Sequence, residues 1–121
     1  MRDRWRTGNF AAWEFLCPCC KVERMDINFI VRLQRARTVA RRSFVIGSGW
    51  RCEARNRAVG GVEDSAHLTG HAADIMTVTS EKRFVVLDAL LEAGFMRIGI
   101  AKFFIHVDDD LAKPQGVIWV Y

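Results

Sequence analysis

The longest regular pattern of apolar positions runs from residue 26 to residue 41 and predicts an α-helix. Apolar side chains recur there at helical spacing, at Phe29, Ile30, Leu33, Ala36 and Ala40. Asp26 precedes the pattern and is a suitable N-cap, because a short carboxylate can accept a hydrogen bond from an amide of the first turn.

Two further helices are expected later in the chain. Ser80 can cap a helix that ends at Gly94, with apolar positions at Phe84, Val85, Leu87 and Leu91. The run CEARNRAV, residues 52–59, predicts a short helix that the two glycines at 60 and 61 end.

Short apolar runs predict the strands. Residues 43–46 form one run, which ends at Gly47 and Gly49, and residues 72–78 form another after a loop at 62–71. Three runs follow late in the chain, MRIGI, FFIHVD and GVIWVY, with a turn expected at residues 113–116. The pattern predicts an α+β domain with a small, mainly antiparallel sheet packed with two or three helices.

Length and composition are those of one globular domain over residues 1–121, with residues 1–8 expected to be loose. No apolar run approaches the ~20 residues of a membrane helix, and no apolar signal region follows the first arginines. We therefore expect synthesis in a cytoplasm without a signal peptide and no membrane partner.

The net charge of +4 favours anionic partners such as nucleic acid or cell-wall polymers. Much of the positive charge lies in RLQRARTVARR, residues 32–42, which is typical of a solvated helix face. A nucleic-acid-binding arm is the alternative, but no aromatic residue is interleaved there, which speaks against nucleic acid as a partner.

The four cysteines, Cys17, Cys19, Cys20 and Cys52, allow three interpretations. They are reduced thiols, or Cys52 forms a disulfide with the 17–20 cluster, or the group binds a structural metal. The C-x-x-C pairs of zinc ribbons are missing, so the sequence leaves the three open.

Two of the chain's three histidines, together with an aspartate, suggest a metal site. His67 lies in the predicted loop, Asp74 in the strand that follows, and His106 in a later strand. Two imidazoles and one carboxylate, with a fourth position left to water, form the ligand set of a catalytic zinc ion. A hydrogen-bonded core histidine is the alternative for His106, which lies between apolar neighbours.

The run SAHLTGHAAD resembles the Ser-x-His-x-x-Gly-x-Ala-x-Asp signature of the zinc D-alanyl-D-alanine peptidases, which share a fold with lysostaphin-type enzymes and the hedgehog signalling domain. All five fixed positions match, at Ser65, His67, Gly70, Ala72 and Asp74. The later His-Val-Asp, residues 106–108, looks like the family's second metal motif. SGWRCEARNRAVGG resembles an upstream segment of the family, with Trp50 in place of a tyrosine. EFLCPCC is similar to the N-terminal part of a small phage and prophage subgroup.

The resemblance implies a hedgehog/DD-peptidase-like fold and one catalytic Zn²⁺ bound by His67, Asp74 and His106. It implies that Arg51 holds a substrate carboxylate or carbonyl, which suits the guanidinium fork, with a surface salt bridge as the alternative. Ser65 is expected near the substrate, bracing the loop or a ligand, and His71 either faces the substrate or is peripheral. Gly70 is expected to permit a backbone shape or close approach that a side chain would block.

One position departs from the family pattern. Well-known members carry an acid three residues before the last histidine as the general base, and Phe103 occupies that position here. Asp108 is the expected substitute, because residues two apart in a strand face the same side. The alternative is that Asp108 orients a metal ligand. Glu63 and Asp64 are looser candidates for the base.

The function predicted from these motifs is zinc-dependent cleavage of peptides in bacterial peptidoglycan, as a D-Ala-D-Ala carboxypeptidase or an L-Ala-D-Glu endopeptidase. The resemblance places such a protein at the cell wall as a phage endolysin or virion component, with a monomer favoured. The alternative is an inactive zinc-containing module of the same fold, and nucleic-acid binding is a third, weaker interpretation.

Overall fold

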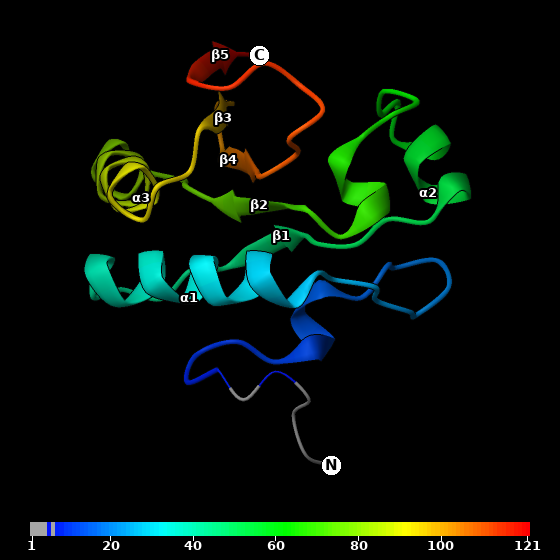
Figure 1. Cartoon of the computed structure of the whole chain (residues 1–121), viewed down its shortest axis with the longest axis horizontal. Helices are drawn as coiled ribbons and strands as arrows, with labels where there is room; N and C mark the ends of the chain where they lie inside the picture. The colour runs from blue at the N-terminus through cyan, green and yellow to red at the C-terminus, as the bar shows by residue number, and fades with distance from the viewer. Residues whose placement is uncertain (1–4, 6) are drawn as a thin grey trace.

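The computed structural model describes Trp5 and residues 7–121, so the loose segment expected at residues 1–8 lies largely outside the described residues. Trp5 itself is buried and packs edge-on against Phe15. The elements, in chain order, are η1 (Ala12–Phe15), α1 (Ile27–Ala40), β1 (Ile46–Ser48), α2 (Glu53–Ala58), η2 (Ala66–Thr69), β2 (Ala72–Met76), α3 (Ser80–Glu92), β3 (Arg97–Ile100), β4 (Phe104–Asp108) and β5 (Val117–Val120). The predicted α+β class is confirmed (Figure 1).

The five strands form one mixed sheet in the order β1-β2-β4-β3-β5. Every neighbouring pair is antiparallel except β3 and β5, which run parallel. Figure 1 shows the strands in this order from β5 at the top to β1, with α1 below β1. Within the described residues, no helix is both long and apolar enough to cross a membrane.

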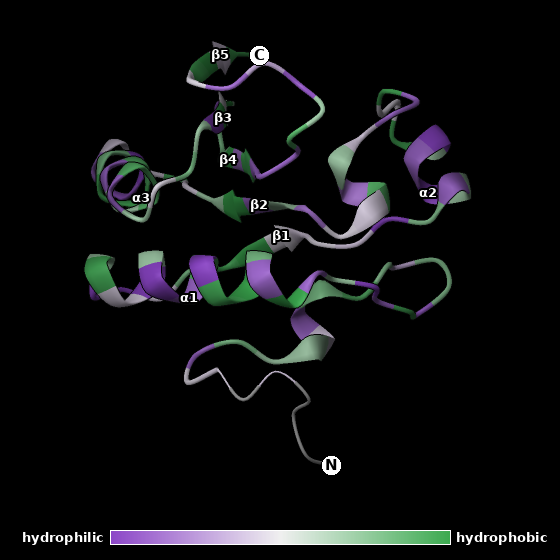
Figure 2. Ribbon diagram, in the orientation of Figure 1, coloured by the Kyte–Doolittle hydropathy of each residue, from purple (hydrophilic) through white to green (hydrophobic). Residues whose placement is uncertain are grey.

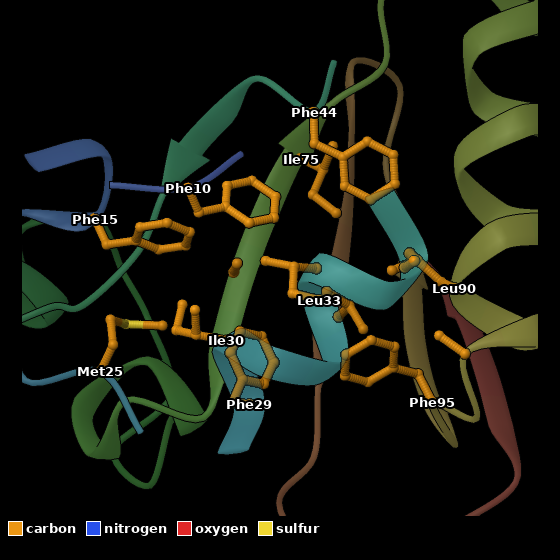
Figure 3. Packing of buried hydrophobic residues seen from close by; sticks show 14 of the residues in the cluster. Phe10, Phe15, Met25, Phe29, Ile30, Leu33, Phe44, Ile75, Leu90 and Phe95 are labelled. Atoms are coloured by element: carbon orange, nitrogen blue, oxygen red, sulfur yellow. The ribbon is translucent and has the colours of Figure 1, made fainter. Parts of the chain in front are cut away.

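The core forms where α1 packs against β2, α3 and the N-terminal segment (Figure 3). Phe29, Ile30, Leu33 and Ala36 of α1 are completely buried, as the helical spacing predicted, and Asp26 caps the helix by accepting from the Phe29 amide at 3.0 Å. Polar and apolar residues alternate along α1 (Figure 2), and its arginines at 32 and 35 are exposed. The basic run is therefore a solvated face over these residues.

The first strand and the last helix differ from the sequence-based expectation. The strand expected at 43–46 lies at Ile46–Ser48, and its register with β2 shifts between Ile46 and Ser48. Gly47 therefore lies within the strand at an irregularity of the kind that glycine favours, and does not end it. The strand predicted over 72–78 ends at Met76, and the loop predicted at 62–71 contains η2.

The last helix differs in its cap and in its buried face. Thr79, and not Ser80, is the N-cap, since its side chain accepts from the Lys82 amide. The face of α3 turned to the core carries Val86, Ala89 and Leu90, while Phe84 is 71% exposed. Apolar residues of α3 occur on all sides of the helix, so the sequence pattern alone does not show which face packs against the core.

Gly70 joins η2 to the start of α1 and fits only as glycine. It has φ +79°, and a Cβ there would overlap the Arg24 carbonyl oxygen and lie 2.8 Å from Met25 Cα. Its own carbonyl accepts from the Asp26 amide at 3.0 Å. Both halves of the expectation for Gly70, an unusual backbone shape and a close approach, are met.

Gly70→Ala is expected to lower the free energy of unfolding by about 2–4 kcal/mol. The loss combines the cost of a left-handed backbone at alanine with the cost of the overpacked Cβ. Gly60→Ala is the matched control, because Gly60 has φ +71° but no heavy atom within 4 Å of an added Cβ. The control should lose only about 1–2 kcal/mol, the cost of the left-handed backbone alone. Urea denaturation measures both, and equal losses would contradict the close approach.

Candidate metal centre

The register of β2 with β4 brings Asp74 and His106 together. The two residues lie directly opposite each other in the antiparallel pair, so their side chains leave the same face of the sheet. Asp74 Oδ1 lies 3.0 Å from His106 Nδ1. The third residue, His67, comes from η2, and its Nε2 lies 3.2 Å from the same Asp74 oxygen. The structure thus places the three residues of the predicted ligand set at one point.

The outer ring nitrogen of each histidine is held by an acceptor. His67 Nδ1 lies 2.7 Å from the Gly49 carbonyl oxygen, and His106 Nε2 lies 2.7 Å from Asp108 Oδ2. Because a carbonyl or carboxylate oxygen accepts, each of these ring nitrogens carries the hydrogen. In a neutral ring, the other nitrogen then presents its lone pair towards Asp74.

This arrangement fits a bound cation. Two lone pairs and a carboxylate oxygen directed at one point repel one another unless protons or a metal ion lie between them. Tetrahedral zinc with bonds of about 2.0–2.1 Å separates its ligand atoms by about 3.3 Å, close to the observed 3.0 and 3.2 Å. Outward hydrogen bonds from ligand histidines to a carbonyl and a carboxylate are also usual at metal sites.

The electrostatics of the cluster reflect the same demand for positive charge. Burial disfavours the ionised carboxyl of Asp74, but hydrogen bonds from His106 and His67 outweigh it and hold its pKa far below the usual value. Burial also disfavours imidazolium at His106, yet hydrogen bonds to Asp108 and Asp74 raise its pKa. The carboxylate of Asp74 therefore remains ionised and available to a metal.

Asp108 lies behind His106, with both carboxylate oxygens engaged. Oδ2 binds His106, while Oδ1 accepts from Arg97 Nε at 2.7 Å and from the Asp110 amide at 3.1 Å. Arg97 faces Asp108 across β3 and β4, and it also donates to the Pro114 carbonyl oxygen. The side chain of Asp108 is only 2% exposed. Of the two roles left open for Asp108, these contacts favour orienting His106 over accepting a proton.

Arg51 approaches the cluster from the segment that follows β1. Its NH2 lies 3.7 Å from Asp74 Oδ2, and its NH1 donates to Asn56 Oδ1 at 2.9 Å. Asn56 is held in turn by the Val62 carbonyl oxygen. Burial lowers the pKa of Arg51, and Asp74 opposes that effect. The guanidinium is therefore positioned beside the cluster of His67, Asp74 and His106 and is not part of a solvated surface ion pair.

The remaining sequence-based candidates take different positions. Ser65 caps η2 by accepting from the His67 amide at 3.2 Å, so it braces the loop that carries His67. His71 hydrogen-bonds Asp109 at 2.7 Å and is not among the residues that line the cleft. Phe103 is 53% exposed and also lies outside the cleft lining, whereas Asp64 is part of it.

The cluster opens into a cleft of about 750 Å³, which is large enough for several residues of a peptide. His67, Asp74 and His106 form part of the lining. Four cationic side chains line it as well, Arg51, Arg55, Arg97 and Lys113. Cationic side chains and the carboxylates of Glu14, Asp64 and Asp108 thus line the cleft around the cluster.

Comparison with known families identifies the chain. A family model described as Peptidase M15 matches residues 4–108, which includes the whole His67, Asp74 and His106 cluster. This chain belongs to the peptidase M15 family. M15 peptidases are zinc-dependent, so the predictions of a metallopeptidase and of a zinc cofactor are confirmed at the level of the family. A comparison with curated proteins gives no match.

Several residues of this M15 site were missed by sequence analysis. The Gly49 carbonyl, Arg97, Asn56 and Trp119 support the cluster or its surroundings through contacts between distant segments. The ring centroids of Trp119 and His106 are 5.5 Å apart, and Arg97 Cζ lies over the Trp119 ring, 5.0 Å from its centroid. The only sequence signal for these residues was an arginine and a tryptophan within short apolar runs.

Asp108→Asn is expected to weaken zinc binding by about ten- to a hundredfold, because it weakens the acceptor that holds His106 Nε2. A competitive chelator titration of the purified variant measures this affinity. Asp109→Asn is the control, as Asp109 bonds His71 away from the cleft. If Asp108→Asn bound zinc like the wild type yet lost all turnover, Asp108 would be the base that the sequence suggested.

Proposed function

We propose that this protein is a zinc peptidase that cleaves peptide bonds in the stem peptides or cross-links of bacterial peptidoglycan. The observation that carries the proposal is the His67, Asp74 and His106 cluster with its outward hydrogen bonds, open to a cleft lined by Arg51. Membership of the M15 family supports the hydrolytic chemistry. The choice of peptidoglycan rests on the resemblance of the Ser65–Asp74 run to D-alanyl-D-alanine peptidases.

The metal would be held by His67 Nε2, His106 Nδ1 and Asp74 Oδ1. When bound, zinc supplies a Lewis acid for a carbonyl group and lowers the pKa of a water molecule. Gly49 and Asp108 keep the two imidazoles in the tautomers that offer their lone pairs inward. The chain's contribution at this stage is a preformed, oriented ligand set.

Arg51 binds the substrate next to the ligands. Its guanidinium is fixed by Asn56, and stem peptides of peptidoglycan carry free carboxylates to which a fixed guanidinium can donate hydrogen bonds. Arg55 and Lys113 extend the positive charge along the cleft. These cations would attract the carboxylates of an anionic peptide, while the carboxylates of Glu14 and Asp64 also line the cleft.

Proton transfer requires a carboxylate that faces the cleft. Both oxygens of Asp108 are occupied by His106, Arg97 and the Asp110 amide, so Asp64, another carboxylate of the cleft lining, is the proposed acceptor. The side chain of Asp64 is 81% exposed and can approach a bound substrate. Phe103 cannot take this role, because its side chain carries no titratable group.

The proposed setting is the bacterial cell wall, reached as a phage endolysin or as a virion component. The similarity of EFLCPCC to a phage and prophage subgroup and the net charge of +4 support this setting. Oligomerisation is not required by the proposal, since all the residues named above belong to one chain.

A second candidate function is a non-catalytic zinc-containing binding module. Phe103 at the position of the usual acid and the full engagement of Asp108 favour it. Such a module would keep the metal and the cleft and would show no turnover.

The peptidase is expected to generate new amine ends from purified peptidoglycan fragments, and a zinc chelator is expected to abolish them. Mass spectrometry of the digest identifies the bond that is cut. His67→Ala should lower the rate of cleavage by about a hundredfold or more, because it removes a proposed metal ligand and weakens the electrostatic stabilisation that the metal would supply.

His71→Ala is the matched comparison, the same substitution at a histidine outside the cleft lining. It should retain activity, and a loss equal to that of His67→Ala would assign His71 to the substrate site as the resemblance suggested. Zinc-containing protein without cleavage of any wall type would overturn the peptidase and leave the binding module.

A further inference from the structure

The four cysteines of the chain meet at a second cluster, formed by two segments. Cys17, Cys19 and Cys20 lie in the loop after η1, and Cys52 is the residue before α2. The four Sγ atoms all lie within 4.8 Å of one another. Cys17 Sγ is 3.5 Å from Cys19 Sγ and 3.6 Å from Cys52 Sγ, and Cys19 Sγ is 3.1 Å from Cys52 Sγ.

The backbone explains how three thiols of one short loop point the same way. The Cys17 amide donates to the Val22 carbonyl oxygen at 2.8 Å, and the Lys21 amide donates back to the Cys17 carbonyl oxygen at 2.8 Å. Lys21 takes a positive φ of 59°, which turns the chain sharply. The loop closes on itself and presents its cysteines to Cys52, whose sulfur accepts from the Arg55 amide.

We propose that Cys17, Cys19, Cys20 and Cys52 bind a second zinc ion, distinct from the one at His67, Asp74 and His106. Four thiolates are the ligand set of a closed structural zinc site, with no position left for water. Tetrahedral zinc with bonds of about 2.3 Å separates its sulfur ligands by about 3.8 Å. The observed 3.5, 3.6 and 3.1 Å among Cys17, Cys19 and Cys52 are somewhat shorter, so these three sulfurs would move apart slightly around the ion. Cys20 Sγ lies within 4.8 Å of the other three and would be the fourth ligand.

A disulfide explains the cluster less well. A disulfide joins two sulfurs at about 2.05 Å and leaves the other two unused. Here Cys52 contacts Cys17 and Cys19 alike, at 3.6 and 3.1 Å, and no pair is bonded. A tetrahedral metal ion requires four ligand atoms close together, and the four sulfurs meet that requirement within 4.8 Å. A single disulfide requires only two of them.

The site would fasten the N-terminal segment to the chain that carries Arg51. Cys52 follows Arg51 directly, and the Trp50 amide donates to the Phe15 carbonyl oxygen at 3.0 Å, so the two segments already adjoin. Leu16 and Pro18, on either side of Cys17, line the catalytic cleft. The second zinc therefore stabilises one wall of the cleft and takes no part in the chemistry.

Variants that remove one site at a time test the assignment by metal content and by spectroscopy. His67→Ala disables the first cluster, and the paired variant Cys19→Ser with Cys20→Ser disables the second at two exposed positions. Protein prepared under reducing conditions should contain about two zinc ions per chain, and each variant about one. Cobalt-loaded His67→Ala should show the intense near-ultraviolet absorption of thiolate-to-cobalt charge transfer, and the paired serine variant should lack it.

The result that would overturn the proposal is a His67→Ala protein that folds, contains no zinc and shows no charge-transfer band with cobalt. Mass spectrometry showing a native disulfide within the cluster would overturn it equally. If the serine variant fails to fold, the cobalt spectrum of His67→Ala alone still decides. None of these readouts depends on peptidase activity, so failure of the proposed catalysis and failure of this site are separate outcomes.

Discussion

The structure of the site depends on one constraint: two imidazole nitrogens and a carboxylate oxygen face a single point, and only positive charge makes that arrangement stable. The supporting contacts follow from it. Gly49 fixes the tautomer of His67, and Asp108 fixes that of His106. Arg97 neutralises Asp108 in its buried position, so that the carboxylate can orient the His106 ring without being left as an unpaired buried charge.

The register of the strands determines whether these side chains can meet at one point. Ser48, Asp74, His106, Gly99 and Trp119 form one row across the strands. A Cβ at Gly99 would lie 2.5 Å from the Trp119 ring nitrogen, so glycine lets that ring cross the row towards His106. The neighbours of Asp74 along β2, Ala73 and Ile75, are buried in the core. A slip of one residue would move Asp74 into the core and the core residues into the cleft.

The sequence predicted those features that depend on local residue patterns. Helical spacing located α1 and its buried face, and the ordered motifs named the three residues that converge. It failed where position depends on distant partners: the buried face of α3, the place of β1 and the pairing of Arg97 with Asp108. The cysteines show the same limit, because only the folded loop at 17–22 brings them to Cys52.

The most direct test of the central claim is a crystal structure of the zinc-loaded protein, with anomalous diffraction measured on both sides of the zinc absorption edge. We expect a peak about 2.0–2.2 Å from His67 Nε2, His106 Nδ1 and a carboxylate oxygen of Asp74, with His106 Nε2 still bonded to Asp108. No peak at that point, or a zinc ion bound through His106 Nε2, would contradict it.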